Sequence, residues 1–247
     1  MKSRFIILFL LVNSLLYAQE ERSNEGGVLL FNFSYAFQIP GGDLADRFGH
    51  NVNIGGGIHF MTKKDWIIGL KGNVLFSQNV KEDVLAGIRN SSGFLIGINK
   101  AFALVSLRER GFYAGGLLGK IWRLGKAETR SGIRTTIGIG LLQHKIRLQD
   151  DSNTANQIFG DYAKGYDRLT NGLALNEFIG YHLLAKNRGM NFFAGFDFTQ
   201  AFTQSRRDVN FDTMQKDETK RVDLLFGFRV GATLSFYVGE PTELILY

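Results

Sequence analysis

The sequence contains no cysteine and only two prolines in 247 residues. The absence of cysteine excludes disulfides, thiolate metal sites and cysteine nucleophiles. Scarce proline suits long hydrogen-bonded strands, because proline cannot donate to a strand ladder. Beyond the first 20 residues no apolar run approaches the length of a spanning helix. The formal net charge is +6 without any run of Lys and Arg, so we expect no nucleic-acid partner.

The first 20 residues, MKSRFIILFLLVNSLLYAQE, have the organisation of an export signal. Lys2 and Arg4 precede an apolar run from Phe5 to Tyr17, and Ala18 followed by Gln19 offers a cleavage site. A basic start, a short apolar stretch and a small residue before the cut are typical of a secretory signal peptide. We therefore expect residues 1–18 to direct export through a cleaved signal and residues 19–247 to form the mature protein.

Alternating apolar side chains are the main pattern of the mature chain, which is rich in Phe and Gly. In LLFNFSYAFQIP (29–40) large apolar residues occupy every second position, and smaller or polar residues lie between them. Successive side chains of a strand point to opposite faces, so this segment has one aromatic face and one small, polar face. The same period predicts strands near 52–60, 66–76, 133–141, 192–202 and 224–236. The less regular segments 102–121 and 173–184 add two strands whose facing the sequence leaves unassigned.

The connections between these strands alternate in length. Those at 62–65, 123–130 and 185–189 are short, whereas those near 40–50, 77–101, 148–172 and 203–222 are long. Short turns on one side and long loops on the other are typical of an outer-membrane barrel. The sequence therefore predicts an all-β fold, an eight-stranded antiparallel up-and-down transmembrane β-barrel with short periplasmic turns and long extracellular loops. The alternative is a soluble β-sandwich, but its polar face would carry more Lys and Glu.

The two faces of the predicted strands differ in chemistry. The apolar face is expected to contact outer-membrane lipid and contains Phe31, Phe33, Tyr35, Phe37, Ile68, Leu70, Phe192, Phe196, Phe198, Phe226 and Phe228. The polar face is expected to fill the lumen with a network of Asn32, Ser34, Lys71, Asn73, Arg134, Asp197 and Arg229. Three cations and one carboxylate in this set require further acids, because an unpaired charge in a dry lumen is costly. Glu109 and Glu177 are the candidates, and a structural network is preferred over a gated or conducting pore.

Aromatic and basic residues near the strand ends add two expectations. Trp66 and Trp122 flank short turns, where aromatic girdles mark a membrane interface. Four basic residues at the long-loop ends are predicted to meet the phosphates of lipopolysaccharide: Arg206, Arg207, Lys220 and Arg221. Asn79 with Glu82 and the spacing of Val80, Val84 and Ile88 indicate a helix in the second long loop. Asp43 is expected to cap a single helical turn closed by Gly49.

The sequence offers weak signals for chemistry. His144 lies near Asp150, Asp151 and Ser152, as a lipid-modifying barrel enzyme would require at its rim. The segment QDDSNTAN (149–156) begins like a calcium loop but lacks the glycine and the later ligands. Solvated rim residues explain both patterns, so we predict no catalytic residue, no metal site and no cofactor.

Several stretches resemble the small outer-membrane β-barrels of the Bacteroidota. They are PGGDLADRFG (40–49), LRERGFYAGGLLGK (107–120), GIGLLQHKIRLQDD (138–151), GYDRLTNGLALN (165–176) and RVDLLFGFRVG (221–231). The architecture is similar to that of OmpA/OmpX-type eight-stranded barrels, and the resemblance covers essentially all of the mature chain. Relatives of this size include the PorT and PorG barrels that accompany type IX secretion, and barrels that travel with the outer-membrane assembly machinery. No diagnostic motif of either subgroup is present.

The resemblance implies a non-enzymatic protein of the Gram-negative outer membrane. We expect a structural or accessory subunit of a secretion (type IX-like) or protein-assembly complex, with protein partners in the envelope. One alternative is a stand-alone OmpX/OmpW-like barrel that supports membrane integrity, binds surface ligands or passes small solutes. The other is a barrel enzyme that modifies lipid A.

Overall fold

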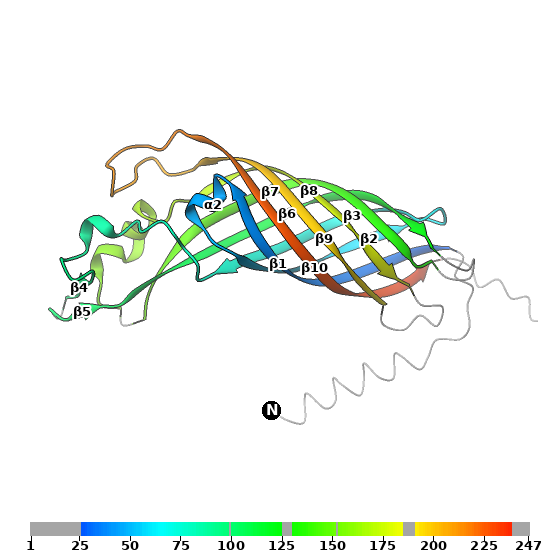
Figure 1. The fold of residues 1–247 in the computed structure, drawn as a ribbon, viewed down its shortest axis with the longest axis horizontal. Helices are drawn as coiled ribbons and strands as arrows, with labels where there is room; N and C mark the ends of the chain where they lie inside the picture. Colours follow the sequence, from blue (N-terminus) through cyan, green and yellow to red (C-terminus); the bar gives the residue numbers. More distant parts are fainter. Residues whose placement is uncertain (1–25, 99, 125–129, 152, 185–190, 239–247) are drawn as a thin grey trace, which may run out of the picture.

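The computed structural model describes residues 26–98, 100–124, 130–151, 153–184 and 191–238. The predicted signal peptide therefore lies outside the described residues. The strands that form the barrel are β1 (Gly27–Gly42), β2 (Asn51–Met61), β3 (Trp66–Ser77), β6 (Val105–Arg123), β7 (Gly132–Asp150), β8 (Thr170–Leu183), β9 (Asn191–Ser205) and β10 (Lys220–Val238). They close in the order β1-β10-β9-β8-β7-β6-β3-β2, and every neighbouring pair is antiparallel. The predicted eight-stranded up-and-down barrel is confirmed (Figure 1).

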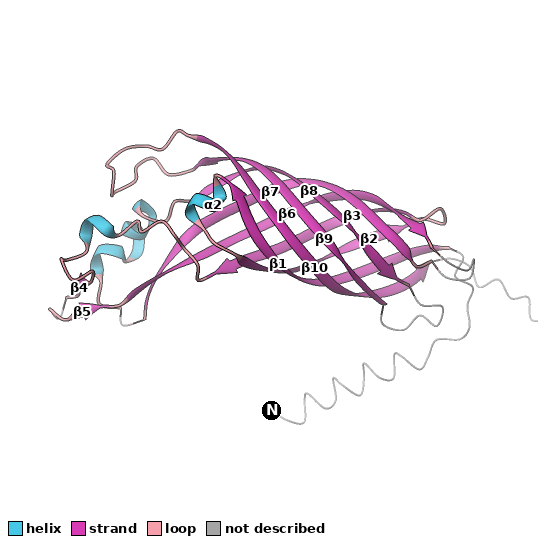
Figure 2. Ribbon diagram, viewed as in Figure 1, coloured by secondary structure: helices cyan, strands magenta, loops and turns pink. Residues whose placement is uncertain are grey.

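The two ends of the barrel differ as the loop lengths predicted. One end, called the loop end below, carries the four long connections 43–50, 78–104, 151–169 and 206–219. The opposite end, called the turn end, carries the connections 62–65, 124–131 and 184–190. The small elements all belong to the loop end (Figure 2): α2 (Leu44–Arg47), η1 (Ala86–Ile88), β4 (Leu95–Ile96), β5 (Phe102–Ala103), η2 (Asn156–Ile158) and η3 (Gly160–Gly165). No helix of the described residues is long and apolar enough to cross a membrane.

The expected helices of the long loops form only in part. The helix predicted around Asn79 and Glu82 is reduced to the short turn η1, because the Glu82 carboxylate bonds arginines of other loops instead of a helix N-terminus. The single turn after Asp43 forms as α2, but the Asp43 side chain accepts a hydrogen bond from the Val222 N–H rather than capping the turn. Tertiary contacts between loops have replaced the local capping bonds.

The structure assigns the facing of the two irregular strands. In β6, glycines at 111, 115 and 119 alternate with Tyr113, Leu117 and Ile121 along the inward face, so large inward side chains recur every four residues and obscure the two-residue period. In β8, the inward positions include Ala174 and Phe178, and apolar residues line both faces. Glu177 is exposed on the outer wall of β8, so the prediction of Glu177 as a lumen acid is wrong.

The lumen is filled in three layers. An apolar cluster closes the turn end and contains Val28, Leu30, Met61, Ile67, Leu117, Ile121 and Leu184. A larger apolar cluster closes the loop end and includes Leu75, Tyr113, Leu142, Ile146 and Leu225, covered by Leu44 and Phe48 of the first long loop. Polar side chains occupy the level between them, as the inward order Ile67, Lys71, Asn73, Leu75 along β3 illustrates. An eight-stranded barrel is narrow enough for side chains to fill it in this way.

Candidate functional site: the lumen, the outer wall and the loop end

Asp197 is the centre of the polar layer. Both of its oxygens accept hydrogen bonds from Arg229, at 3.1 Å from Nε and 2.9 Å from Nη2. Lys71 donates to Asp197 Oδ1 at 3.2 Å and to Asn176 Oδ1 at 2.7 Å. Asn176 and Gln38 also donate to the Asp197 carboxylate. One buried carboxylate therefore neutralises two cations only in part, and amides complete its hydrogen bonding.

Arg134 belongs to the same layer, yet no carboxylate of the described residues contacts it. Its side chain is 4% exposed. Nη1 donates to Asn32 Oδ1 at 3.3 Å, and Nη2 lies 3.0 Å from His59 Nδ1. The guanidinium lies 5.2 Å from the ring centre of Phe193 and 5.8 Å from that of Phe178, a geometry in which aromatic faces attract a cation.

The remaining predicted lumen residues lie beside these cations. Ser34 Oγ accepts a hydrogen bond from Arg229 Nη1 at 2.8 Å, and Asn73 Oδ1 lies 3.5 Å from the same nitrogen. Asn32 Oδ1 also accepts from Thr233, at 2.8 Å. The predicted network did not include His59 or Asn176, although both occupy inward positions, His59 in the period-two pattern of β2 and Asn176 in the less regular β8. Polar side chains at inward positions next to a lone carboxylate are the signal that points to them.

Two further buried carboxylates of the described strands, Glu109 and Asp223, lie nearer the loop end and have partners of their own. Glu109 is fully buried and accepts a hydrogen bond from Asn51 at 3.2 Å. Asp223 bonds His144 Nε2 at 2.9 Å and Thr203 Oγ1 at 2.5 Å. Glu109 therefore lies in the lumen as expected of a candidate acid, but it pairs with an amide and does not contact the cations of the polar layer.

The residue types of a hydrolase triad meet at His144, Asp223 and Thr203, but their hydrogen bonds do not follow the order of a triad. In such a triad the histidine lies between the hydroxyl and the carboxylate, so that it can remove the hydroxyl proton. Here the same Asp223 oxygen bonds both partners, and the Thr203 hydroxyl donates to the acid directly. His144 is also 2% exposed and packs against Phe48, 5.6 Å between ring centres. This arrangement binds the β7, β9 and β10 walls together and leaves no activated nucleophile.

Large apolar side chains cover the outer wall of the barrel. All eleven residues expected to face lipid lie on the outer face of their strands. Nine of them are exposed, and Phe31 and Phe198 are half-buried. Neighbouring strands place aromatic rings in contact, for example Phe196 against Phe228 at 5.7 Å and Phe198 against Phe226 at 5.0 Å. Phe31 pairs with Phe236 at 5.5 Å. Trp66 and Trp122 are also exposed, at the turn end, and the Lys120 ammonium lies over both rings.

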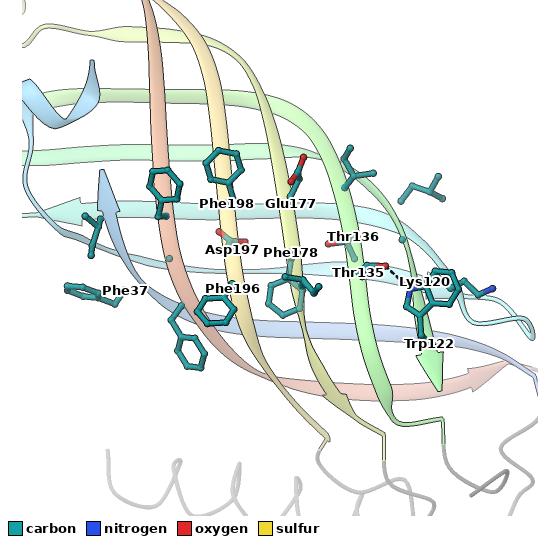
Figure 3. A pocket seen from close by; sticks show the side chains of 18 of the residues that line it. Phe37, Lys120, Trp122, Thr135, Thr136, Glu177, Phe178, Phe196, Asp197 and Phe198 are labelled. Carbon is teal, nitrogen blue, oxygen red and sulfur yellow. Dashed lines mark hydrogen bonds between the residues drawn. The ribbon is translucent and has the colours of Figure 1, made fainter. Parts of the chain in front are cut away.

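Glu177 interrupts this apolar wall. It is exposed on β8, and its cross-strand neighbours are Ile137 on β7 and Phe198 on β9. Figure 3 shows this part of the wall, where a shallow apolar hollow is lined by Glu177 together with Phe196, Phe198, Trp122 and Thr135. Trp122 Nε1 donates to Thr135 Oγ1 at 3.0 Å within the same hollow. No cation of the described residues pairs with the Glu177 carboxylate.

At the loop end, ion pairs connect the long loops to one another. Arg168 donates from Nε to Glu82 at 2.7 Å and from both terminal nitrogens to Asp212, with Nη1 at 2.9 Å. Arg47 bonds the other oxygen of Glu82 at 2.7 Å. The hydrogen bonds from Arg168 hold the pKa of the Asp212 carboxyl below its usual range. We call Arg47, Glu82, Asp167, Arg168, Arg207 and Asp212 the loop cluster; it joins all four long loops.

Of the four residues predicted to meet lipopolysaccharide, two form ion pairs with carboxylates of the protein. Arg207 forms a bidentate pair with Asp167, at 2.8 and 2.6 Å, and Arg221 pairs with Asp217. Arg206 is exposed and donates to the Asn171 side-chain oxygen at 2.6 Å. Lys220 is exposed at the start of β10. Within the described part of the chain, Arg206 and Lys220 have no carboxylate partner.

In the acidic segment 149–156, aspartate side chains accept hydrogen bonds from nearby backbone and side-chain groups. Asp150 Oδ2 accepts hydrogen bonds from the N–H groups of Thr154 and Ala155, at 2.7 and 2.8 Å. Asp151 accepts one from the Gln149 amide at 2.7 Å. Among the described residues, no group of three or more His, Cys, Asp or Glu side chains is placed to hold a metal ion.

Comparisons with known proteins concern the fold alone. No model of a protein family matches the chain, and no curated protein sequence matches it. Neisserial surface protein A is 10% identical with a TM-score of 0.45, and the match covers 86% of this chain and all of that chain. Ail of Yersinia pestis, in complex with the heparin analogue sucrose octasulfate, is 11% identical with a TM-score of 0.41. The match covers 85% of this chain and 99% of Ail. The outer membrane protein OprG from Pseudomonas aeruginosa is 10% identical with a TM-score of 0.42. The match covers 89% of this chain and all of the OprG chain. Likeness at these values assigns neither a ligand nor an activity to the chain.

Proposed function

We propose that the chain is a non-enzymatic barrel of the Gram-negative outer membrane that acts as an accessory subunit of an envelope complex for secretion or protein assembly. The exposed apolar wall supports a membrane location, because soluble proteins rarely expose apolar patches of this extent. The observation that carries the subunit role is Glu177, a carboxylate exposed among Ile137, Phe198 and Ile179.

A carboxylate on the lipid-facing wall is unfavourable in the hydrocarbon of a bilayer, although less so than Lys or Arg. Ionisable residues at membrane depth usually face a protein interior or a partner group. A second membrane protein that presents a Lys, an Arg or another hydrogen-bond donor at this depth offsets the cost. The wall around Glu177 on β8 and β9 is therefore the face that we assign to the partner.

The alternatives receive less support from the structure. A route for small solutes has to pass the apolar clusters that close the lumen near Leu30 and near Leu142. A lipid-A-modifying enzyme needs a nucleophile or general base at the rim, whereas His144 is buried and bonded to Asp223. A stand-alone barrel that supports membrane integrity leaves Glu177 without a role.

Site-specific photocrosslinking in living cells tests the subunit role. A photoreactive amino acid at Ile179, the next outward position of β8, is expected to yield a protein adduct. The matched control is Ile58 of β2, which is similarly exposed (53% against 55%) on the opposite wall of the barrel. The Ile179 adduct is expected to disappear in Glu177→Leu, while the variant still migrates as a folded barrel without heating. Absence of a protein adduct at Ile179, or equal adducts at both positions, contradicts the proposal.

We also propose lipopolysaccharide as a lipid partner at the loop end. Arg206 and Lys220 are exposed beside the ends of β9 and β10, and a guanidinium or ammonium there suits lipid phosphates. Arg206→Ala combined with Lys220→Ala is expected to lower the lipopolysaccharide that co-purifies in mild detergent. The matched control is Lys216→Ala with Lys164→Ala, two exposed lysines of the loops. Unchanged retention in the first variant counts against the contact.

A further inference from the structure

The polar layer of the lumen encloses a small cavity surrounded by more positive than negative charge. The cavity measures about 30 Å³ and is lined by side chains that include Lys71, Arg134, Arg229 and His59. The only carboxylate of the described residues that bonds any of these cations is Asp197, which pairs with Lys71 and Arg229. With formal charges, the layer therefore carries three positive groups and one negative group.

Two N–H donors of residues that line the cavity have no acceptor in the part of the chain that the structure describes. His59 Nδ1 faces donors from both Arg134 and Asn32, at 3.0 and 2.9 Å, so it accepts and the ring proton is on Nε2. Neither His59 Nε2 nor Arg134 Nε has a hydrogen-bond partner among the described residues, and both side chains are at least nine-tenths buried. A buried donor without an acceptor is costly, and more so when it belongs to a charged group.

From this combination we infer that the lumen cavity beside Arg134 and His59 is a binding site for a small inorganic anion such as chloride. A monatomic anion beside Arg134 supplies the missing acceptor for its Nε and lowers the excess positive charge of the layer. A water molecule, for which a cavity of about 10–15 Å³ is large enough, also fits but leaves the charge unbalanced.

The surroundings explain how such an ion is retained. The apolar clusters at both ends close the lumen, so the ion enters while the barrel forms. The Phe178 and Phe193 rings cover one side of the Arg134 guanidinium, so no other acceptor approaches it from that side. The site is therefore a structural one, in which the anion stabilises the folded barrel and is not transported. It is independent of the partner face at Glu177.

An isosteric variant tests the charge argument. Asn32 Oδ1 lies 3.3 Å from Arg134 Nη1, so Asn32→Asp places a carboxylate on the unpaired guanidinium without a change of volume. The same change removes the amide donor to His59 Nδ1. Arg134→Met removes the excess cation and keeps the side chain long and apolar. Both variants are expected to fold, and both are expected to lose the dependence on a small anion.

The experiment compares urea unfolding of the detergent-refolded barrel in chloride and in gluconate at equal ionic strength, followed by the fluorescence of Trp66 and Trp122. For the wild type, the folding constant is expected to rise with chloride by a factor of 1 + [Cl⁻]/Kd, about tenfold at nine times Kd. Gluconate is too large for the cavity and is expected to have no such effect. Equal stability in the two salts overturns the inference, and so does a chloride effect that persists undiminished in Asn32→Asp and Arg134→Met, because it then arises elsewhere.

Discussion

The loop cluster and the polar layer of the lumen are both built from buried or half-buried arginines, but their charges are balanced differently. In the loop cluster Arg168 meets both Glu82 and Asp212, and Arg207 meets Asp167 with two hydrogen bonds. In the lumen, Lys71 and Arg229 share one carboxylate and Arg134 has only neutral partners. The loop cluster neutralises itself, whereas the lumen layer does not.

This difference follows from where the two clusters lie. The loops can adjust their backbone until each guanidinium reaches a carboxylate, and solvent screens what remains. The lumen positions are fixed by strand register. A cation there can therefore pair only with the few side chains at the same level of the barrel. Breaking an ion pair in the lumen is therefore expected to cost more than breaking one in the loop cluster.

Asp197→Asn is expected to have the largest effect. It leaves Lys71 and Arg229 without their carboxylate and should lower the free energy of unfolding by about 3–5 kcal/mol. The matched control in the loop cluster is Asp212→Asn, for which we expect a markedly smaller loss. Urea unfolding in detergent measures both variants, and similar losses in the two would contradict the contrast between the clusters.

Arg168→Ala is expected to have an intermediate effect that is confined to the loop end. Loss of its bonds to Glu82 and Asp212 should free the segment 206–219 while the barrel stays folded. Hydrogen exchange of the amides in 206–219 is expected to accelerate about tenfold, which corresponds to about 1.4 kcal/mol. Exchange in β9 should not change; if it accelerates equally, the loop cluster is coupled to the whole barrel.

Acid is expected to open the loop cluster at a defined pH. Because hydrogen bonds from Arg168 hold the pKa of Asp212 below its usual range, the pair stabilises the loops fully above the unfolded value of about 3.9. The stabilisation is lost as the pH falls from there through the folded pKa of Asp212. Hydrogen exchange of 206–219, corrected for intrinsic rates, should therefore rise below about pH 4. Arg168→Ala should abolish this step, and a step at the same pH in that variant would assign it to another group.

The smallest effect is expected for a cation that belongs to neither cluster. Lys120 lies 5.3 Å from the Trp66 ring centre and 4.7 Å from that of Trp122, at the turn end. Exposed cation–π contacts contribute about 0.5–1 kcal/mol, so Lys120→Ala should lower the free energy of unfolding by no more than that. Lys120→Arg, which keeps a cation above the rings, is the control and should match the wild type.

The sequence predicts the barrel more completely than it predicts the groups inside it. Strand number, antiparallel order and loop lengths follow from the period-two pattern and the spacing of turns, and these depend on local properties of the chain. The facing of β6 was not predictable, because Tyr113, Leu117 and Ile121 place large side chains on the inward face, where the pattern requires small or polar residues. The prediction of Glu177 as a lumen acid is wrong for a related reason, since Phe178 faces inward in β8 and apolar residues therefore occur on both faces.

The partners of charged residues were beyond sequence reasoning. Arg168 meets Glu82 and Asp212 from loops that are far apart in the chain, and no spacing rule connects them. The excess of cations in the lumen, by contrast, was visible from Lys71, Arg134, Asp197 and Arg229 once the inward face was known. The expected carboxylate for Arg134 is absent from the described residues, and that absence motivates the anion site.

The most direct test of the account is anomalous diffraction from crystals of the protein refolded in bromide instead of chloride. Refolding is needed because the apolar clusters close both ends of the lumen. A bromide peak is expected in the cavity, within hydrogen-bonding distance of Arg134 Nε. A cavity that contains only water, with bromide confined to the outer surface, would contradict it.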